Sequence, residues 1–410
     1  MTWEEKRVLV TGISGFVGPL LAKYLVKQGA KVYGLTRRIA QFTKPLRVKQ
    51  LGIEDKIELI EGNLTDISSL GNALDVAEPE VIFHLAAQSY VPYSFVNPLE
   101  SMHANAMGTN YLLESMRLKD SDATMVLAGS SEEYGLVISS QQQYERVLKK
   151  YGSIFPPPQE IPEIPTSETD PLRPMSPYAV SKVASDYATR NYWNTYGVKG
   201  IVSRGFNHEG AGRGIMFVTS VITSQIVGLK IGTTDKMVIG NVSAFRDWSH
   251  VDDIVKGYCA ISQKGKPGEV YNQGSMRTNS VLTYLLWSFE EAGYPIKSIE
   301  TFQGEKKIDN PTEPNDDVAF GIKFDKTKVD QMFINEELDF AIDDKGLKIK
   351  TETKEFTLEF NPDRFRPSEV PILLSDTSKV QKLGVSYESS VKDIIRDQLN
   401  YYLEERHREQ

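Results

Sequence analysis

Short apolar runs and helical segments alternate along the first half of the chain. Apolar or alternating runs too short for a helix predict strands. They occupy residues 8–10, 31–35, 56–60, 81–83, 125–128 and 201–202, and residues 56–60 are the alternating run. Between these runs apolar residues recur at helical spacing, as in residues 19–26. Strands that alternate with helices are connected by right-handed parallel crossovers. The pattern therefore predicts an α/β fold with a doubly wound parallel sheet.

A glycine-rich turn joins the first predicted strand to the first predicted helix. It reads Thr11-Gly12-Ile13-Ser14-Gly15-Phe16-Val17-Gly18. In such a turn two glycines let the backbone approach a pyrophosphate, and a third lets the helix pack closely on the strand. The N-terminus of the helix offers free N–H groups to phosphate oxygens. We therefore predict a Rossmann-type dinucleotide site, with a merely tight turn as the alternative, formed by Gly12, Ser14, Gly15, Phe16, Val17 and Gly18.

The end of the second strand indicates which dinucleotide is bound. A site for NAD places Asp or Glu there to bind a ribose hydroxyl, whereas this chain has Thr36-Arg37-Arg38. Two guanidinium groups suit the additional phosphate of NADP. We predict NADP as the cofactor, and the alternative is that both arginines are surface charges. The residues expected to complete this site follow the third and fourth strands: Asn63, Leu64, Leu85, Ala86 and Ala87.

Tyr178 and Lys182 are four residues apart in a segment predicted to be helical as far as about Tyr196. Residues at this spacing lie on one face of a helix. A tyrosine has an ordinary pKa near ~10, and a cation beside it favours the phenolate, which can exchange a proton with a substrate hydroxyl. Tyrosine–lysine pairs also occur on solvated helices. The predicted NADP site would supply a hydride acceptor, which favours a site for alcohol–ketone interconversion.

Ser130, Ser131 and Glu132 follow the fifth predicted strand. Ligands of doubly wound sheets bind at the carboxyl ends of the strands. We predict that the two serines hydrogen-bond the oxygen whose proton Tyr178 transfers, and that Glu132 transfers a second proton. The alternative is a structural role, because serines and acidic residues at strand ends are common in turns and caps.

Two arginines that are far apart in the sequence are candidates for binding a diphosphate. Arg246 precedes Asp247-Trp248, and Arg366 begins the segment Arg366-Pro367-Ser368-Glu369. Guanidinium groups bind phosphates in a bidentate manner. Each arginine taken singly is equally compatible with a structural ion pair.

The length of 410 residues predicts more than one domain. We expect residues 1–204 to form the NADP-binding domain, with an insertion at about 137–165 and with residues about 241–270 returning to it. The insertion is rich in proline and suits a lid, an oligomer contact or surface decoration.

The remaining residues are expected to form a smaller α+β substrate-binding domain. It comprises residues 205–240 and 271–410, with an insertion at about 305–361. Within that insertion, residues 347–351 and 354–360 alternate as two strands of a hairpin.

Composition and charge exclude several classes of partner. The net charge is −8 and there is no long basic run, which disfavours bulk binding to nucleic acid or to an acidic membrane. The single cysteine, Cys259, excludes an internal disulfide and a cysteine metal cluster, and the five histidines suggest no metal site. No apolar run is long enough to span a bilayer, and the N-terminus leaves no room for a signal peptide. We expect a cytoplasmic protein.

Together the glycine turn, Ser130, Tyr178 and Lys182 resemble the extended short-chain dehydrogenase/reductase superfamily. Within it, the closer resemblance is to the GDP-mannose 4,6-dehydratases. Ser130 in place of Thr and Asn63 in place of Asp depart from that family, and the two insertions leave the sugar and the base open. The segments that carry the closer resemblance are Arg37-Arg38, Ser130-Ser131-Glu132, Phe206-Asn207-His208-Glu209, Arg213-Gly214, Phe217-Val218-Thr219, Gly240-Asn241, Arg246-Asp247-Trp248 and Arg366-Pro367-Ser368-Glu369-Val370.

This resemblance implies a redox-neutral lyase that converts GDP-mannose into GDP-4-keto-6-deoxy-mannose while NADP+ is reduced transiently. Tyr178, assisted by Lys182, would take the C4 hydroxyl proton. Glu132 would remove the C5 proton and assist loss of the C6 hydroxyl as water. The resemblance also implies a homodimer or homotetramer and a substrate site formed by Asn207, Glu209, Arg213, Val218, Arg246, Arg366 and Glu369.

Two other kinds of function remain open from the sequence. Gly129–Gly135 and Leu172–Tyr178 also resemble the GDP-4-keto-6-deoxy-mannose reductases, which would use Tyr178 and Lys182 once, with NADPH. Another nucleotide-sugar epimerase or dehydratase is a related alternative, although Glu132 argues against a simple 4-epimerase. A binding protein that senses NADP without turnover would have no need of the tyrosine–lysine pair.

Overall fold

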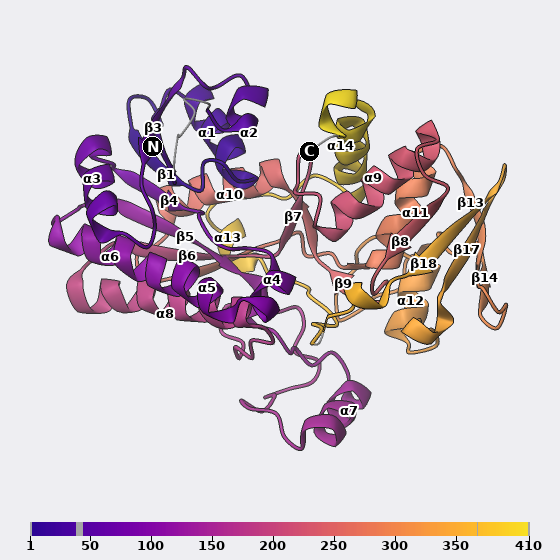
Figure 1. Cartoon of the computed structure of the whole chain (residues 1–410). Helices are drawn as coiled ribbons and strands as arrows, with labels where there is room; N and C mark the ends of the chain where they lie inside the picture. Colours follow the sequence, from indigo (N-terminus) through magenta and orange to yellow (C-terminus); the bar gives the residue numbers. More distant parts are fainter. Residues whose placement is uncertain (1, 38–43, 367, 409–410) are drawn as a thin grey trace.

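The main body of the molecule is a seven-stranded parallel sheet in the order β11-β6-β5-β4-β1-β2-β3 (Figure 1). The computed structural model describes residues 2–37, 44–366 and 368–408, so Arg38 of the predicted cofactor site lies outside the described residues. The sheet confirms the predicted doubly wound α/β fold. Its strands are β1 (Arg7–Thr11), β2 (Lys31–Thr36), β3 (Ile57–Glu61), β4 (Val81–His84), β5 (Thr124–Ser130), β6 (Gly200–Gly205) and β11 (Val270–Gln273).

Successive side chains of β1 are buried in two different cores, one on each face of the sheet. Val8 and Val10 belong to the core formed with helices on one face of the sheet, and Leu9 belongs to the core on the other face. Successive strand side chains point to opposite faces, so a strand covered by helices on both faces is apolar throughout. The helices of the first face are α1 (Val17–Lys27) and α10 (Val251–Lys264), and those of the second are α3 (Ile67–Ala77), α6 (Gly108–Leu118) and α8 (Pro177–Tyr196).

The strand order reverses between β1 and β4, which lie side by side although two other strands separate them in sequence. Loops leave the carboxyl ends of these two strands in opposite directions. This divergence opens the crevice in which doubly wound sheets bind their ligands.

The second body is a five-stranded mixed sheet in the order β14-β13-β17-β18-β8. The predicted hairpin is confirmed, because β17 and β18 pair antiparallel. Three helices, α9 (Val218–Ile231), α11 (Val281–Glu291) and α14 (Val391–Leu403), share the apolar core of this body. The five strands are β8 (Lys236–Ile239), β13 (Ile296–Thr301), β14 (Lys307–Asp309), β17 (Gly346–Thr351) and β18 (Glu355–Phe360).

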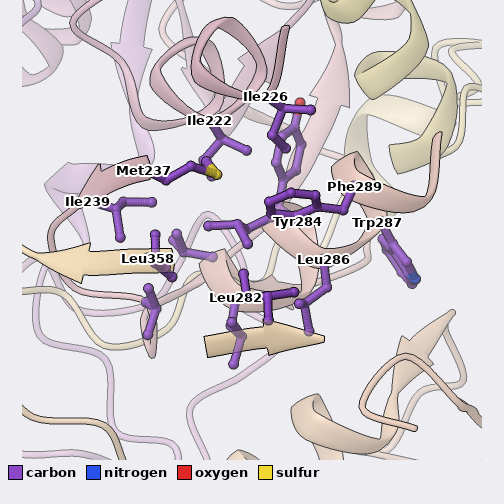
Figure 2. Packing of buried hydrophobic residues seen from close by; sticks show 14 of the residues in the cluster. Ile222, Ile226, Met237, Ile239, Leu282, Tyr284, Leu286, Trp287, Phe289 and Leu358 are labelled. Atoms are coloured by element: carbon purple, nitrogen blue, oxygen red, sulfur yellow. The ribbon is translucent and has the colours of Figure 1, made fainter. Parts of the chain in front are cut away.

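Figure 2 shows how that core draws on distant parts of the chain. Ile222 and Ile226 of α9 meet Met237 of β8, Leu282 of α11 and Leu358 of β18, and all five are buried. Burying one such side chain fully contributes about 1.5–3 kcal/mol. The residues at about 305–361, to which the sequence assigned no chemistry, thus supply two central strands of this sheet.

The chain passes between the two bodies more than once. Strand β11 adds to the large sheet as far as Gln273, three residues beyond the expected return at about 270. Val380 and Val385 also pack in the core beneath α1 and α10, although the sequence placed residues 271–410 in the substrate-binding domain.

Helix α7 (Gln141–Tyr151) projects away from the main body within the segment 137–165 (Figure 1). The buried pair Arg173–Glu163, at 2.6 Å, anchors the base of this projection. Arg146 of α7 also pairs with Glu336 of the second body at 2.7 Å.

Short elements connect these parts. Over the described ranges, no helix has both the length and the apolar composition needed to cross a membrane. The remaining elements are α2 (Leu46–Gln50), α4 (Val91–Val96), α5 (Pro98–Ser101), η1 (Met102–Met107), η2 (Ser131–Glu133), β7 (Asn207–Glu209), β9 (Phe245–Arg246), β10 (Trp248–His250), β12 (Asn279–Ser280), β15 (Pro314–Asn315), β16 (Lys326–Thr327), α12 (Lys328–Ile334), η3 (Ile342–Asp344), η4 (Pro362–Arg364), α13 (Ser378–Gln381) and η5 (Glu405–His407).

Candidate active site

A cavity of about 830 Å³ lies at the carboxyl ends of the central strands, where the strand order reverses. Its walls come from the large sheet on one side and from residues 205–217 and Arg366 on the other. Most of the residues singled out in the sequence line it. They are Gly12, Ser14, Gly15, Phe16, Val17, Gly18, Arg37, Asn63, Leu64, Leu85, Ala86, Ala87, Ser130, Ser131, Glu132, Tyr178, Lys182, Asn207, Arg213 and Arg366.

The glycine turn leaves no room for side chains at two of its positions. Gly12 has φ of +76°, and a Cβ there would lie 2.8 Å from the backbone nitrogen of Ala86. A Cβ on Gly18 would lie 2.3 Å from the carbonyl oxygen of Gly12. Helix α1 begins directly after this turn with no side-chain cap and no acidic residue in its first turn. Its free N–H groups and positive dipole end suit the pyrophosphate of a dinucleotide.

A buried hydrogen-bond network holds the small residues that follow β4. The backbone N–H of Ala86 donates to Thr11 Oγ1 at 3.1 Å, and Thr11 Oγ1 lies 2.9 Å from His84 Nδ1. Burial lowers the pKa of His84 to about 3, so the ring is neutral and Nδ1 can accept from the threonine hydroxyl. This network fixes the loop 85–87 against the glycine turn.

Tyr178 and Lys182 lie one turn apart on α8, and both are buried in the cavity wall. The Lys182 ammonium donates to the carbonyl oxygen of Ala128 at 2.7 Å and lies 5.9 Å from the centre of the Tyr178 ring. Burial lowers the pKa of Lys182 to about 8. The lysine therefore keeps its positive charge at neutral pH.

Burial raises the pKa of the Tyr178 phenol, and the charge of Glu132 adds to this effect. A hydrogen bond with Ser130 and the charge of Arg213 act in the opposite direction. Desolvation disfavours the charged form of any buried acid. The phenol consequently resists ionisation more strongly than the pairing with Lys182 alone predicts.

Glu132 projects from the turn after β5 towards the wall formed by Arg366. The two side chains form an ion pair of 3.4 Å between Arg366 Nη1 and Glu132 Oε1. Ser130 Oγ accepts from the backbone N–H of Glu132 at 3.2 Å. Tyr178 and Glu132, two side chains whose chemistry allows proton transfer, thus line the same cavity.

Four residues predicted to bind substrate do not line the cavity: Glu209, Val218, Arg246 and Glu369. Glu209 lies behind Arg213, with 3.4 Å between Oε2 and Nε. Arg246 donates to the carbonyl oxygen of Val370 and to Glu369 Oε1 at 2.6 Å. Glu369 in turn lies 3.6 Å from Arg366. Glu209, Arg246 and Glu369 support the arginines of the cavity wall from behind.

Sequence reasoning missed several residues of the cavity. Arg47 of α2 lies over the ring of Phe16, with 5.6 Å between its guanidinium carbon and the ring centre. Arg213 lies 3.5 Å from the centre of the Phe217 ring. No local sequence pattern marks Arg47 as a residue of the cavity. Its helix has only five residues, which is too short for a clear helical periodicity. Other unpredicted lining residues include Gln88, Glu100, His103, Phe217 and Tyr258.

The fold and the cavity together define a dinucleotide-binding enzyme of the doubly wound α/β class. Residues 8–274 match the NAD dependent epimerase/dehydratase family, and the chain belongs to this family.

Curated relatives match almost the whole chain. The chain is 30% identical over 410 residues to a GDP-mannose 4,6-dehydratase of Sinorhizobium fredii (strain HH103). The matched region covers 97% of this chain and 98% of the relative. It is 33% identical over 338 residues to GDP-mannose 4,6 dehydratase 1 of Arabidopsis thaliana, which covers 80% of this chain and 84% of the relative.

Solved structures share the fold over nearly the full length. UDP-glucose 4-epimerase of Thermotoga maritima, with UDP-glucose, has a TM-score of 0.67 at 20% identity and covers 97% of this chain and 98% of its own. RMD from Pseudomonas aeruginosa, complexed with NADPH, has a TM-score of 0.64 at 20% identity with the same coverage.

Proposed function

We propose that the protein is a nucleotide-sugar 4,6-dehydratase that converts GDP-mannose into GDP-4-keto-6-deoxy-mannose. Near full-length similarity to GDP-mannose 4,6-dehydratases supports this activity. The observation that carries the proposal is the presence of Glu132 in the same cavity as Tyr178 and Lys182. Oxidation of an alcohol needs one proton-transfer group, and elimination of water needs a second.

Tyr178 takes the proton of the C4 hydroxyl in the proposed reaction. Ser130 hydrogen-bonds the phenol, and Arg213 and Lys182 provide positive charge around it. Because burial raises the pKa of Tyr178, these cationic neighbours are needed to stabilise the developing phenolate. Ser131, the first residue of the turn η2 that follows Ser130, contacts the C4 oxygen in this proposal.

Glu132 removes the C5 proton, which the C4 ketone makes acidic, and protonates the departing C6 hydroxyl. The Arg366 guanidinium at 3.4 Å holds the carboxylate in the cavity wall. Since Arg366 also lines the cavity, its remaining donors face the substrate diphosphate together with Arg213. Asn207 also lines the cavity, and its buried Oδ1, which has no hydrogen-bond partner, can accept a hydrogen bond from a hydroxyl of the substrate.

The residues of the glycine turn fit a dinucleotide, since side chains at Gly12 and Gly18 would collide with backbone atoms. A bound nicotinamide would accept the C4 hydride and return it to C6. We infer NADP because Arg37 lines the cavity at the end of β2, where an NAD site carries Asp or Glu. The proposed lyase therefore consumes no cofactor.

We further propose that the enzyme acts as a homo-oligomer in the cytoplasm. Val96 and Leu99, on α4 and α5, are 77% and 82% exposed, and Tyr187 on α8 is 55% exposed. Helices α4 and α5 both pack against α8, and exposed apolar side chains on neighbouring helices favour a protein–protein contact. The single cysteine is free and buried, as suits a reducing compartment.

The decisive experiment incubates the protein with GDP-mannose and a catalytic amount of NADP+, and follows the mass of the product. Loss of one water per sugar, with no net NADPH formed, is the expected result. No reaction with GDP-mannose, combined with NADPH oxidation in the presence of GDP-4-keto-6-deoxy-mannose, would instead identify a reductase. Substituting NAD+ tests the cofactor preference.

A further inference from the structure

Glu133 lies directly behind the reacting groups, and the proposed mechanism does not use it. The side chain is fully buried, at 0% exposure, in the turn η2. Its Oε1 accepts the backbone N–H of Ser130 at 2.7 Å. An acidic side chain rarely lies so deep unless it is paired, so its partners determine its state.

The neighbouring ion pairs leave one oxygen of Glu133 without a hydrogen bond. Arg204 Nε donates to Asp186 Oδ2 at 2.9 Å and lies 3.3 Å from Glu133 Oε2. Asp186 also receives Arg190, at 2.6 Å. Two arginines therefore pair with Asp186, whereas the buried Oε2 of Glu133 has no hydrogen-bond partner.

A proton on Oε2 would give this buried oxygen of Glu133 a hydrogen bond to donate. A buried carboxylate oxygen that accepts no hydrogen bond and only lies 3.3 Å from Arg204 Nε is costly. A protonated carboxyl carries no charge and gains a donor. That donor faces the Asp186 carboxylate. Burial and the charge of Asp186 both raise the pKa of Glu133.

The charge on Glu133 would act on the two groups that handle the substrate proton. A negative charge there raises the pKa of Tyr178, which opposes formation of the phenolate. It also raises the pKa of Lys182. Helix α8 and strand β6 pack against η2. The charged and titratable groups around Glu133 come from α8, from β6, from its own turn and from the segment before α8: Tyr178, Lys182, Asp186, Arg190, Arg204, Glu132, Tyr134 and Glu168.

We propose that Glu133 is a positioning residue held as a neutral carboxylic acid: Oε1 fixes the Ser130 backbone, and Oε2 carries a proton directed at Asp186. The neutral state keeps a further negative charge away from Tyr178 during proton transfer. The catalytic consequence rests on the proposed dehydratase function, whereas the protonation state does not.

Infrared spectroscopy of the substrate-free protein tests the protonation state directly. The wild-type protein at pH 6.5 should show the carbonyl stretching band of a buried protonated carboxyl group. This band should be missing from Glu133→Gln and should persist in Glu168→Gln, a matched variant that alters a neighbouring acid outside the cavity. A spectrum in which Glu133→Gln removes no such band would overturn the proposal, whether or not GDP-mannose is a substrate.

The pH dependence of kcat then tests the positioning role. Glutamine keeps an acceptor for Ser130 and a donor for Asp186, so at pH 6.5 the kcat of Glu133→Gln should lie within about 3-fold of wild type. The ratio of variant to wild-type kcat should rise at higher pH, where the wild-type carboxyl ionises. Glu133→Leu, which lacks the acceptor, should lose about 10-fold or more in kcat with little change in KM. A loss in Glu133→Gln of the same size at every pH would contradict the neutral-acid role.

Thermal unfolding provides a readout that needs no turnover. The native state should bind one more proton than the unfolded chain between the ordinary pKa of a glutamate and the raised pKa of Glu133. The wild-type protein therefore loses unfolding free energy as pH rises through that interval, and Glu133→Gln should lose less. A constant difference in Tm between the two proteins across this interval would count against the proposal.

Discussion

The two walls of the cavity are built in different ways. The wall around the glycine turn includes positions with no room for a side chain, and two of them, Gly12 and Gly18, lie within one short segment of chain. The opposite wall depends on charged side chains. Arg366 lines the cavity and pairs with Glu132. Glu369, 3.6 Å from Arg366, and its partner Arg246 support the wall from behind. The first wall depends on local conformation, whereas the second exists only when distant segments meet. Substitutions in the two walls should therefore have separable effects.

The largest effect is expected at Tyr178, which takes the C4 hydroxyl proton in the proposed reaction. Tyr178→Phe should lower kcat about 1,000-fold, because it removes the proton-transfer group, while the affinities for NADP+ and GDP-mannose change little. Turnover assays and calorimetric titrations measure these quantities. Tyr187→Phe, on the exposed face of the same helix, is the matched control and should leave kcat unchanged. Near wild-type kcat in Tyr178→Phe would remove the tyrosine from the mechanism.

Gly18→Ala should weaken NADP+ binding about 10- to 100-fold, since the added Cβ meets the Gly12 carbonyl oxygen at 2.3 Å and displaces the helix start. Binding of GDP-mannose should change far less. Gly71→Ala controls for alanine in a helix, because its Cβ meets nothing closer than 3.6 Å. Calorimetric Kd values for both ligands test this prediction. An equal loss of affinity for NADP+ and GDP-mannose would show that the two walls do not act separately.

Glu369→Gln should raise the KM for GDP-mannose about 10-fold and leave the NADP+ affinity unchanged. It removes the charge that pairs with Arg246, in a pair whose side chains are 7% and 25% exposed. Loss of this charged hydrogen bond also costs about 1.5–3 kcal/mol of unfolding free energy. Glu359→Gln is the control, because its pair with Lys236 is exposed and contributes about 0–1 kcal/mol. Kinetics and urea unfolding measure both effects. An unchanged KM would leave Glu369 a purely structural role.

The smallest effect is expected at Arg37, which is exposed at the end of β2. Arg37→Ser should weaken NADP+ binding about 5-fold and leave NAD+ binding unchanged, because only NADP+ carries the additional phosphate and an exposed charge contact is worth about 1 kcal/mol. Titration with the two dinucleotides measures this ratio. Equal weakening of both would show that Arg37 contacts a part that they share.

Much of the cofactor wall could be predicted from the sequence, because strand, turn and helix are local patterns. The runs at residues 8–10 and 81–83 are strands β1 and β4, and the glycine turn lies between β1 and α1 as expected. The helix that carries Tyr178 and Lys182 also matches, since α8 ends at Tyr196. Each of these features follows from backbone propensity and apolar periodicity over a few residues.

The supporting wall could not be predicted in the same way. Arg246 was expected at the diphosphate, yet its donors are taken by Glu369 and by backbone carbonyls. Glu133 stands beside Glu132 in the sequence, but one side chain is buried beneath the turn and the other faces the cavity. Neighbouring residues of one type acquire different roles only through the elements that pack against them.

The sequence by itself determined the parallel sheet, the phosphate-binding turn and the tyrosine–lysine helix, because their physical causes act over a few residues. Tertiary structure decided which charges meet. Glu132 and Arg366 are 234 positions apart, and Asp186 rather than Glu133 receives the shorter contact from Arg204. Such pairings depend on burial and on three-dimensional distance, which no local pattern encodes.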